Sequence, residues 1–214
     1  MKILAVDTAL GACSAALLDG ENVLAAKFAV MQRGHAEALA PMVQAVMTGF
    51  DFAALDKLAV TVGPGTFTGQ RVGLAFMRAL RVATGKPLVG VTSLAAMAEQ
   101  AGAQSGIAVA AAVHDARRGE VYIEIIGKEF AASVMTFENA LAVLRDRGTP
   151  IVLAGSAAVR MAEAMAPLEP VVVDILAPDA IWVARLAAPL EPLRSPPRPL
   201  YLRAPDAKLP GAKP

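Results

Sequence analysis

Apolar and polar positions in the first half of the chain predict short strands separated by amphipathic helices. Three apolar runs near the N-terminus indicate strands, and Asp19-Gly20 between the second and third is typical of a hairpin turn. From His35 onward apolar residues recur every three or four positions, as in a helix with one buried face. The predicted elements are strands 2–6, 13–18 and 23–30, helix 35–48, strand 58–62, helix 70–83, strand 88–91 and helix 92–100.

The second half repeats this order of elements. Asp7 and Asp115 each follow an apolar strand, and Gly11 and Gly119 each precede the next strand at the same offset. The pattern predicts two related α/β lobes with mixed sheets, in which both aspartates face an interlobe cleft. The predicted elements here are strands 107–113 and 120–126, helix 137–147, strand 151–153, helix 156–165, strand 171–173 and helix 178–188.

The stretch from Gly102 to Gly106 marks the expected boundary between the lobes. We assign residues 1–103 to the N-terminal lobe and residues 104–214 to a smaller C-terminal lobe with a proline-rich tail. Prolines are dense from Pro189 onward, so this tail is expected to be extended and loosely packed. The basic residues of the tail that can approach phosphates are Arg194, Arg198, Arg203, Lys208 and Lys213.

Composition narrows the class of protein. Hydrophobic residues make up 56% of the 214 residues and aromatic residues only 5%, so the core is expected to consist mainly of Ala, Val, Leu and Met. A formal net charge of +1 argues against a general nucleic-acid binder. The single cysteine, Cys13, excludes an internal disulfide and a cysteine-cluster zinc site. No apolar run has the length of a signal-peptide core or a membrane span, so we expect a cytoplasmic protein without membrane contact.

The segment from Gly63 to Gly69, GPGTFTG, is a glycine-rich turn between a predicted strand and a predicted helix. Such a turn suits an anion, because free backbone N–H groups and the helix dipole point at it. Neither nucleotide-loop pattern fits, since the Lys-Ser/Thr of a P-loop and the GxGxxG spacing are both missing. The alternative is that the glycines allow close packing of the strand against the helix.

The two histidines predict no catalytic or metal site. His35-Ala36-Glu37 is similar to the HxE of zinc deaminases, but that site also needs a PCxxC pair that one cysteine cannot supply. We therefore expect a structural role for His35 at a helix start or an interface. Asp115 lies beside His114 without a nucleophile in any recognisable pattern, so a turn aspartate is expected there.

Six stretches together resemble the TsaB (YeaZ) family of bacterial tRNA-modification proteins. They cover both halves in order: ILAVDTALGACSAALLDG, QRGHAEALAPMV, VGPGTFTGQRVGLAF, GVTSLAAMA, DARRGEVY and PLYLRAPDAK. The resemblance implies a two-lobed actin-like, hexokinase-like and Hsp70-like ATPase fold with ribonuclease H-like lobes, in which mixed sheets are flanked by helices. The family signature is carried here by Gly63, Pro64, Gly65, Thr66, Phe67, Thr68, Gly69, Arg71, Asp115, Arg117, Gly119 and Glu120.

The resemblance also implies a function. TsaB-like proteins are non-catalytic partners that pair with and activate the catalytic paralogue TsaD, together with the ATPase TsaE. The assembly transfers a threonylcarbamoyl group from threonylcarbamoyl-adenylate to the adenosine beside the anticodon of ANN-decoding tRNAs. We expect no cofactor on this chain, ATP or ADP entering only through the assembled complex, and tRNA contact only through that complex.

The catalytic paralogue carries two metal-binding histidines at i and i+4, and in this chain those positions fall on Ser93 and Met97. Neither suits a catalytic metal, so no metal is expected. Asp7-Thr8 occupies the place of the superfamily's first phosphate-binding loop, which leaves a residual nucleotide site as a weaker expectation. Arg117, with its neighbour Arg118, is suited to an anion or to acidic residues of a partner.

The family's dimer contacts, with TsaD or with a second copy, are implied for two helices of the N-terminal lobe. The contact positions expected on these helices are His35, Leu39, Met42, Val43, Val46, Val72, Leu74, Met77 and Leu80. On that basis Met77→Glu or Val46→Glu is expected to abolish pairing and to leave a folded monomer. The alternative function is a degenerate sugar-kinase-like or acetate-kinase-like ATP-binding enzyme, or a metalloprotease-like protein of the same fold.

Overall fold

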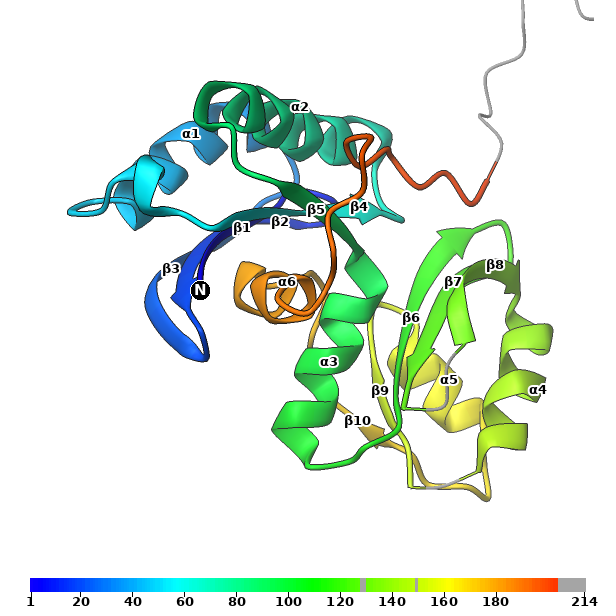
Figure 1. Cartoon of the computed structure of the whole chain (residues 1–214). Helices are drawn as coiled ribbons and strands as arrows, with labels where there is room; N and C mark the ends of the chain where they lie inside the picture. Colours follow the sequence, from blue (N-terminus) through cyan, green and yellow to red (C-terminus); the bar gives the residue numbers. More distant parts are fainter. Residues whose placement is uncertain (128–129, 149, 204–214) are drawn as a thin grey trace, which may run out of the picture.

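Two five-stranded mixed sheets carry the fold within the residues that the computed structural model describes, 1–127, 130–148 and 150–203 (Figure 1). In each sheet the first three strands along the chain pair antiparallel and the next two pair parallel, which gives the orders β3-β2-β1-β4-β5 and β10-β9-β6-β7-β8. The shared connectivity confirms the predicted repeat. The strands are β1 (Lys2–Asp7), β2 (Ala12–Asp19), β3 (Asn22–Val30), β4 (Lys57–Gly63), β5 (Leu88–Thr92), β6 (Ala110–Arg117), β7 (Glu120–Ile126), β8 (Phe130–Thr136), β9 (Val152–Ala154) and β10 (Val171–Val172).

Helices cover both faces of each sheet (Figure 1). Helices α1 and α2 lie on the outer face of the first sheet and α6 on its other face, whereas α3 lies between the two sheets. Helices α4 and α5 cover the far face of the second sheet. The helices are α1 (His35–Val46), α2 (Phe67–Thr84), α3 (Ser93–Ser105), α4 (Phe137–Arg147), α5 (Ala158–Ala164) and α6 (Ala180–Ala187), with a short 3₁₀ turn η1 (Phe52–Ala54).

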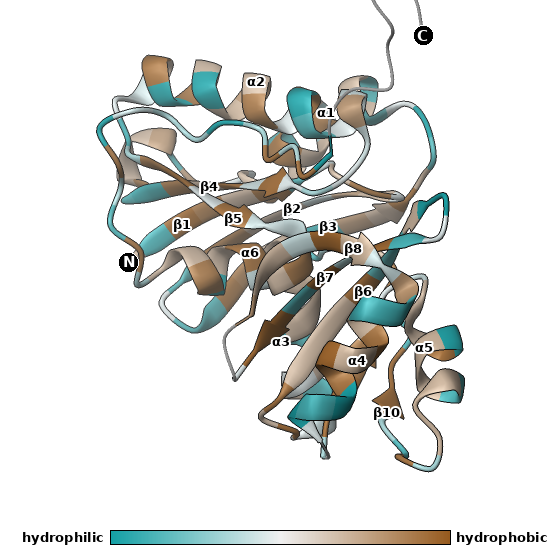
Figure 2. Ribbon diagram, turned by 90° about the vertical axis from the view of Figure 1, so that its right-hand side faces the viewer, coloured by the Kyte–Doolittle hydropathy of each residue, from teal (hydrophilic) through white to brown (hydrophobic). Residues whose placement is uncertain are grey.

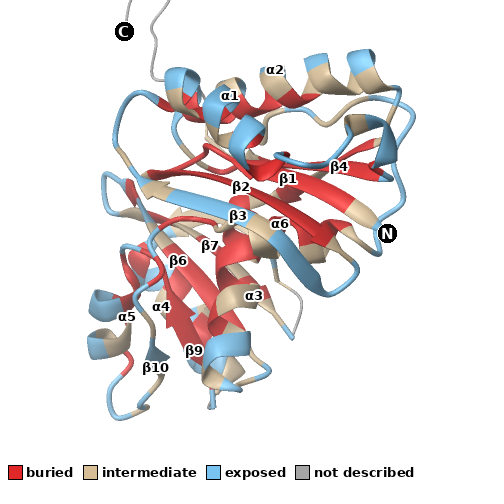
Figure 3. Ribbon diagram, turned by 90° about the vertical axis from the view of Figure 1, so that its left-hand side faces the viewer, coloured by how far each residue is buried: buried red, intermediate tan, exposed pale blue. Residues whose placement is uncertain are grey.

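The central strand β1 is buried on both faces, and Figure 3 shows β1, β2 and β4 mostly red, in contrast to the exposed edge strand β3. Successive side chains of a strand point to opposite faces. Leu4 and Val6 therefore pack in the cluster under α1 and α2, while Ile3 and Ala5 pack against α6. This double burial explains why the strand is a continuous apolar run in the sequence rather than an alternating one.

The interior between the lobes is built from small apolar residues. Ala9 and Ala12 of the first lobe, Met97 of α3 and Ala110 of the second lobe belong to one buried cluster. Short side chains let α3 approach both sheets closely, and Figure 2 shows the hydrophobic colouring of the facing strands. The two lobes thus share a core instead of meeting at a polar contact.

Side-chain caps begin most of the helices. The hydroxyl oxygens of Thr66, Thr92 and Thr136 accept hydrogen bonds from backbone N–H groups in the first turns of α2, α3 and α4. Asp179 does the same for α6. These caps satisfy donors that have no partner within the helix. Because Thr66 is the cap, α2 begins at Phe67, three residues earlier than predicted.

Two further boundaries differ from the sequence prediction. Helix α3 continues to Ser105 through Gly102, where we expected the lobe boundary, and it ends at the left-handed Gly106. Strand β8 was not predicted, because Ala and Ser interrupt its apolar alternation. The division at residue 103 stays a prediction. The structure adds that α6 packs on the first sheet, so the core of the first lobe includes residues from near the C-terminal end of the described chain.

The tail from Pro189 is extended as expected, and the expectation of loose packing is wrong for residues 196–203, whereas residues 189–195 are exposed. Residues 196–203, called the C-terminal strap below, run along α2 and the edge of the first sheet (Figure 1). Leu200 N–H donates to the Val62 carbonyl at 2.8 Å, and Arg78 Nε donates to the Pro197 carbonyl at 3.0 Å. These bonds fix an extended segment without regular structure. Lys208 and Lys213 lie outside the described residues.

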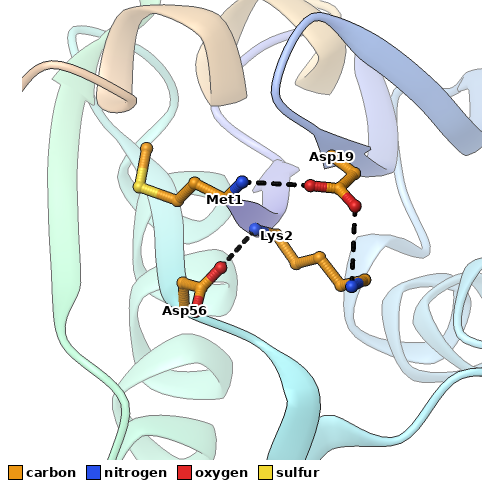
Figure 4. Close-up of polar contacts among 4 residues, drawn as sticks. All are labelled: Met1, Lys2, Asp19 and Asp56. Atoms are coloured by element: carbon orange, nitrogen blue, oxygen red, sulfur yellow. Dashed lines mark hydrogen bonds and ion pairs between the residues drawn. The ribbon is translucent and has the colours of Figure 1, made fainter.

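The start of β1 is held at the surface by polar contacts (Figure 4). The Met1 amino group donates to Asp19 Oδ1 at 3.0 Å, and Lys2 Nζ lies 3.5 Å from Asp19 Oδ2. Lys2 N–H donates to Asp56 Oδ2 at 2.6 Å. These groups are well exposed, so they align the strand ends more than they stabilise the fold.

Candidate functional site

The glycine turn, residues 63–69, packs directly on the loop that joins β1 to β2. Thr66 N–H donates to the Ala9 carbonyl at 2.8 Å. A Cβ on Gly65 would lie 2.2 Å from the Ala9 oxygen, and one on Gly69 would lie 2.2 Å from the Thr8 oxygen. Only glycine fits such close backbone contacts. In this structure the glycines of the turn therefore allow close backbone packing, which is the alternative to an anion site.

Thr8 links this loop to the first turns of α2. Its hydroxyl donates to the Gly69 carbonyl at 2.7 Å and accepts from Gly73 N–H at 3.0 Å. Gln70 Nε2 adds a bond to the Gly65 carbonyl at 2.9 Å. Together these contacts fix where α2 begins and how it sits on the sheet.

Asp7 lies beneath the turn and is fully buried. Its Oδ1 accepts the Thr61 hydroxyl at 2.5 Å and the Ala9 N–H at 3.1 Å, while Oδ2 has no hydrogen-bond partner among the described residues. Burial raises the pKa of Asp7 to about 7, although the bonds from Thr61 and Ala9 oppose the shift. Asp179, whose own pKa burial also raises, adds to the shift at Asp7.

This geometry bears on the expected nucleotide residues. Asp7 and Thr8 have almost no exposed surface, and the hydroxyl of Thr8 already makes two bonds to α2. The two aspartates at equivalent turns also differ in environment, because Asp115 is exposed. The expectation that both face a cleft is therefore wrong for Asp7, which the glycine turn covers.

The second lobe presents the hairpin between β6 and β7. Asp115 Oδ1 accepts Arg117 N–H at 2.9 Å, so Asp115 is a turn aspartate as predicted. Arg117 and Arg118 both adopt positive φ, 65° and 55°, and both are exposed. Glu120 Oε2 lies 3.0 Å from Arg203 Nη2, which joins the hairpin to the strap. The signature residues of this hairpin are thus at the surface.

Polar groups also join the lobes at the start of α3. The Thr92 hydroxyl donates to Glu124 Oε2 of β7, and Ser93 Oγ donates to the Pro64 carbonyl of the glycine turn at 2.5 Å. Burial raises the pKa of Glu124, opposed by the bonds from Thr92 and the Ala95 N–H. Sequence reasoning missed Glu124, which has no local signal because its partner is 32 residues away.

The histidine positions expected for a metal in the paralogue are occupied here by packing residues. Ser93 donates to Pro64, and Met97 is fully buried in the interlobe cluster. Among the described residues, no group of three or more His, Cys, Asp or Glu side chains is arranged to hold a metal. In the same residues no helix is long and apolar enough to cross a membrane.

Burial lowers the pKa of His114, and its Nδ1 has no hydrogen-bond partner among the described residues.

His35 is the first residue of α1 and is nearly buried. Its Nε2 donates to the Leu10 carbonyl at 3.1 Å, since a carbonyl oxygen can only accept. This bond ties α1 to the same β1–β2 loop that the glycine turn covers. The predicted structural role of His35 is confirmed.

The predicted partner residues on α1 and α2 lie mostly in the core. The buried ones share a single cluster against the first sheet: Leu39, Val43, Val46, Leu74 and Met77. As direct contact residues they are wrong, because their apolar periodicity reflects packing on the sheet. Met42, Val72 and Leu80 are half-buried at its margin.

The outward surface of the two helices consists of other residues, which we call the α1–α2 outer face. Most are small and apolar, and Figure 3 shows exposed, pale-blue segments along both helices. They are Ala36, Ala40, Pro41, Ala45, Ala75, Ala79, Val82 and Ala83. Val82 is 81% exposed.

Comparisons with known proteins agree with these features. The family described as TsaD, tRNA N6-adenosine threonylcarbamoyltransferase, matches residues 27–163. The tRNA threonylcarbamoyladenosine biosynthesis protein TsaB of Escherichia coli strain K12 is 40% identical over 124 residues, or 57% of this chain and 53% of that protein. The chain thus spans about half the length of that relative.

Solved structures match over nearly the whole chain. A Pseudomonas aeruginosa protein described as similar to the peptidase YeaZ has a TM-score of 0.79 and 31% identity, covering 94% of this chain and 99% of that one. The ROK hexokinase of Thermus thermophilus has a TM-score of 0.51 and 14% identity over 86% and 98% of the two chains. The second likeness concerns the fold alone and confirms the expected actin-like ATPase fold.

Proposed function

This chain belongs to the TsaB (YeaZ) family, and from that premise we propose that it is a non-catalytic platform subunit in tRNA threonylcarbamoyladenosine biosynthesis. In this role it pairs with a TsaD-like catalytic paralogue and activates it. The observation that carries the proposal is the family match, because the curated relative is named for that biosynthesis. The chain has a role in the pathway; its non-catalytic character is the proposed part.

The surroundings of the expected catalytic positions support a non-catalytic role. Asp7 and Thr8 are buried under the glycine turn, so neither presents an oxygen to a nucleotide in this arrangement. Ser93 and Met97 stand where the paralogue carries metal-binding histidines, and both side chains are used in packing. ATP or ADP then acts through the assembled complex, with a TsaE-like ATPase as the further partner.

The α1–α2 outer face is the surface that we propose for pairing. Small side chains allow two pairs of helices to approach closely. The charged residues on the same two helices are the exposed Glu37 and Arg71 and the half-buried Arg78 and Arg81. A second copy of this chain is the alternative occupant of the same face. The buried residues beneath it, Leu74 and Met77 among them, support the helices from below.

Reconstitution tests the function. Threonylcarbamoyl transfer to tRNA is measured with purified TsaD-like and TsaE-like proteins, with and without this chain. We expect transfer to depend on the chain. Undiminished transfer without it would refute the platform role.

Charge insertion tests the surface. Val82→Glu and Ala79→Glu are expected to abolish co-elution with the TsaD-like protein, because each places a carboxylate in an apolar contact. Val159→Glu is the matched control, since Val159 is an exposed valine, 61% accessible, on α5 of the other lobe. Retained pairing of both α2 variants, or equal loss with the control, would contradict the assignment.

A further inference from the structure

An exposed stack of two aromatic rings and one guanidinium lies at the start of α2. Arg71 Cζ lies 3.5 Å from the centroid of the Phe67 ring, and the Phe67 and Tyr201 rings are stacked with centroids 6.0 Å apart and planes 24° apart. Arg71 Nε donates to the Tyr201 hydroxyl at 2.9 Å. Phe67 is 55% exposed and Tyr201 is 46% exposed. The contacts therefore fix the orientation of rings that still present much of their surface to solvent.

The C-terminal strap builds this stack and connects it to the second lobe. Leu200 is hydrogen-bonded to Val62 of β4, which places Tyr201 beside α2. Two residues later, Arg203 Nη1 donates to the Ala116 carbonyl at 2.8 Å, at the hairpin that carries Arg117. The strap thus connects the rings, through Arg203, to the hairpin of the second lobe, near which the described part of the strap ends in Figure 1.

The local charge is positive although the chain as a whole has a net charge of only +1. Four arginines come from three segments of the chain. Arg71 belongs to α2, Arg117 and Arg118 to the β6–β7 hairpin, and Arg203 to the C-terminal strap. The carboxylates on the same hairpin are Asp115 and Glu120, and Glu120 is paired with Arg203. The positive excess is therefore concentrated beside the exposed rings.

From this geometry we propose that the Phe67–Arg71–Tyr201 stack and the β6–β7 hairpin form an RNA-contact site. An unpaired base stacks on the exposed aromatic surface, and phosphates of the same strand pair with the hairpin arginines. The inference rests on the proposed function, which makes a tRNA the RNA in question. It assigns to this chain a direct part in holding the tRNA within the assembled complex.

RNA fits the chemistry better than a protein partner does. Hot spots of protein interfaces cluster in well-packed pockets from which water is excluded. Here the rings are bordered by arginines and by the exposed Thr68, which is how single-stranded nucleic acid is bound: aromatic surfaces for bases and positive groups for the backbone.

The test uses the complex of this chain with its TsaD-like partner and a labelled ANN-decoding tRNA. Phe67→Leu keeps an apolar side chain and removes the aromatic surface, so tRNA affinity is expected to fall about tenfold. Phe67→Trp keeps an aromatic surface and is expected to stay within about twofold of the wild type. Phe28→Leu is the matched control, because Phe28 is 47% exposed on the edge strand β3; no change is expected.

Two further readouts identify the ligand. A photo-crosslinking phenylalanine analogue at position 67 is expected to crosslink to tRNA, and Arg117→Ala is expected to reduce the salt dependence of binding by about one counterion. Unchanged tRNA affinity of Phe67→Leu, or loss of co-elution with the partner instead of tRNA binding, would overturn the proposal. Failure of the proposed function itself is a different result, namely transfer activity that does not require this chain.

Discussion

The Cα of Gly69 lies so close to the Thr8 carbonyl that a Cβ at position 69 would come within 2.2 Å of the oxygen. The carbonyl is part of the backbone of the β1–β2 loop, which the Thr8 hydroxyl also ties to Gly73. Both the Thr8 carbonyl and the backbone at position 69 are held by the main chain, so moving either one costs free energy. The glycine thus sets the distance between the first loop and the first turn of α2.

Gly69→Ala is therefore expected to destabilise the protein by about 2 kcal/mol or more, through overpacking against backbone. The free energy of unfolding is measured by chemical denaturation. Gly11→Ala is the control, because its Cβ would meet only the flexible end of Gln32. Equal stability of the two variants would show that the loop yields more readily than the structure indicates.

Asp7 is expected to make the fold less stable as the pH rises. Its folded pKa of about 7 lies above the ordinary value of 3.8, so between these values the folded state keeps a proton that the unfolded state has lost. Unfolding then releases a proton, and the free energy of unfolding falls from about pH 4 to about pH 7. Above pH 7 the free energy of unfolding has lost the whole contribution from the Asp7 proton, on the order of 4 kcal/mol.

Asp7→Asn removes this ionisation and keeps the side-chain shape. Free energies of unfolding of the two proteins are compared from pH 4 to pH 8. The value for the variant is expected to increase relative to the value for the wild type as the pH rises. The difference isolates Asp7 from Glu124 and Asp179, whose pKa values burial also raises. Parallel curves would mean that Asp7 ionises normally in the fold.

Lys57 is expected to be a structural lysine. It is buried at the start of β4, and its ammonium donates to the carbonyls of Ala187, Ala188 and Leu190 at 3.0, 2.8 and 2.8 Å. Lys57→Met leaves these carbonyls at the end of α6 without a partner, which is expected to cost about 2–3 kcal/mol. Lys27→Met on the exposed strand β3 serves as control in thermal unfolding and is expected to change little.

Met77→Glu is now expected to unfold the protein. Met77 has no exposed surface in the core beneath α2, and burying a carboxylate there costs a large part of the total stability of a domain. Val82→Glu on the outward side of the same helix is expected to stay within about 0.5 kcal/mol of the wild type. Circular dichroism melting of both variants checks this contrast, and a folded Met77→Glu protein would refute the burial.

Much of the fold follows from local features of the sequence. The Asp19-Gly20 hairpin and the Thr92 cap of α3 act over a few residues, so their effects can be predicted without a structure, whereas the Thr66 cap of α2 was missed. The repeat of Asp7–Gly11 in Asp115–Gly119 likewise predicted two lobes of the same connectivity. Strand β8 was missed because it lacks a strong alternating pattern.

The candidate surfaces depended on long-range contacts. The contacts from Tyr201 to Arg71 and from Arg203 to Ala116 join residues 130 and 87 positions apart, and no periodicity marks them in advance. The burial of Asp7 likewise depends on a turn more than fifty residues later in the chain.

The order and type of most elements and the strand-to-helix turn at Gly63–Gly69 follow from the amino-acid sequence alone, because backbone preferences and apolar periodicity are local properties. Periodicity shows that one face of a helix is buried, but not which surface buries it. The packing of Leu39, Val46 and Met77 against the sheet of their own chain became visible in the three-dimensional structure. It also left Ala79 and Val82 facing outward, since the helices are amphipathic and the sheet covers one side of each.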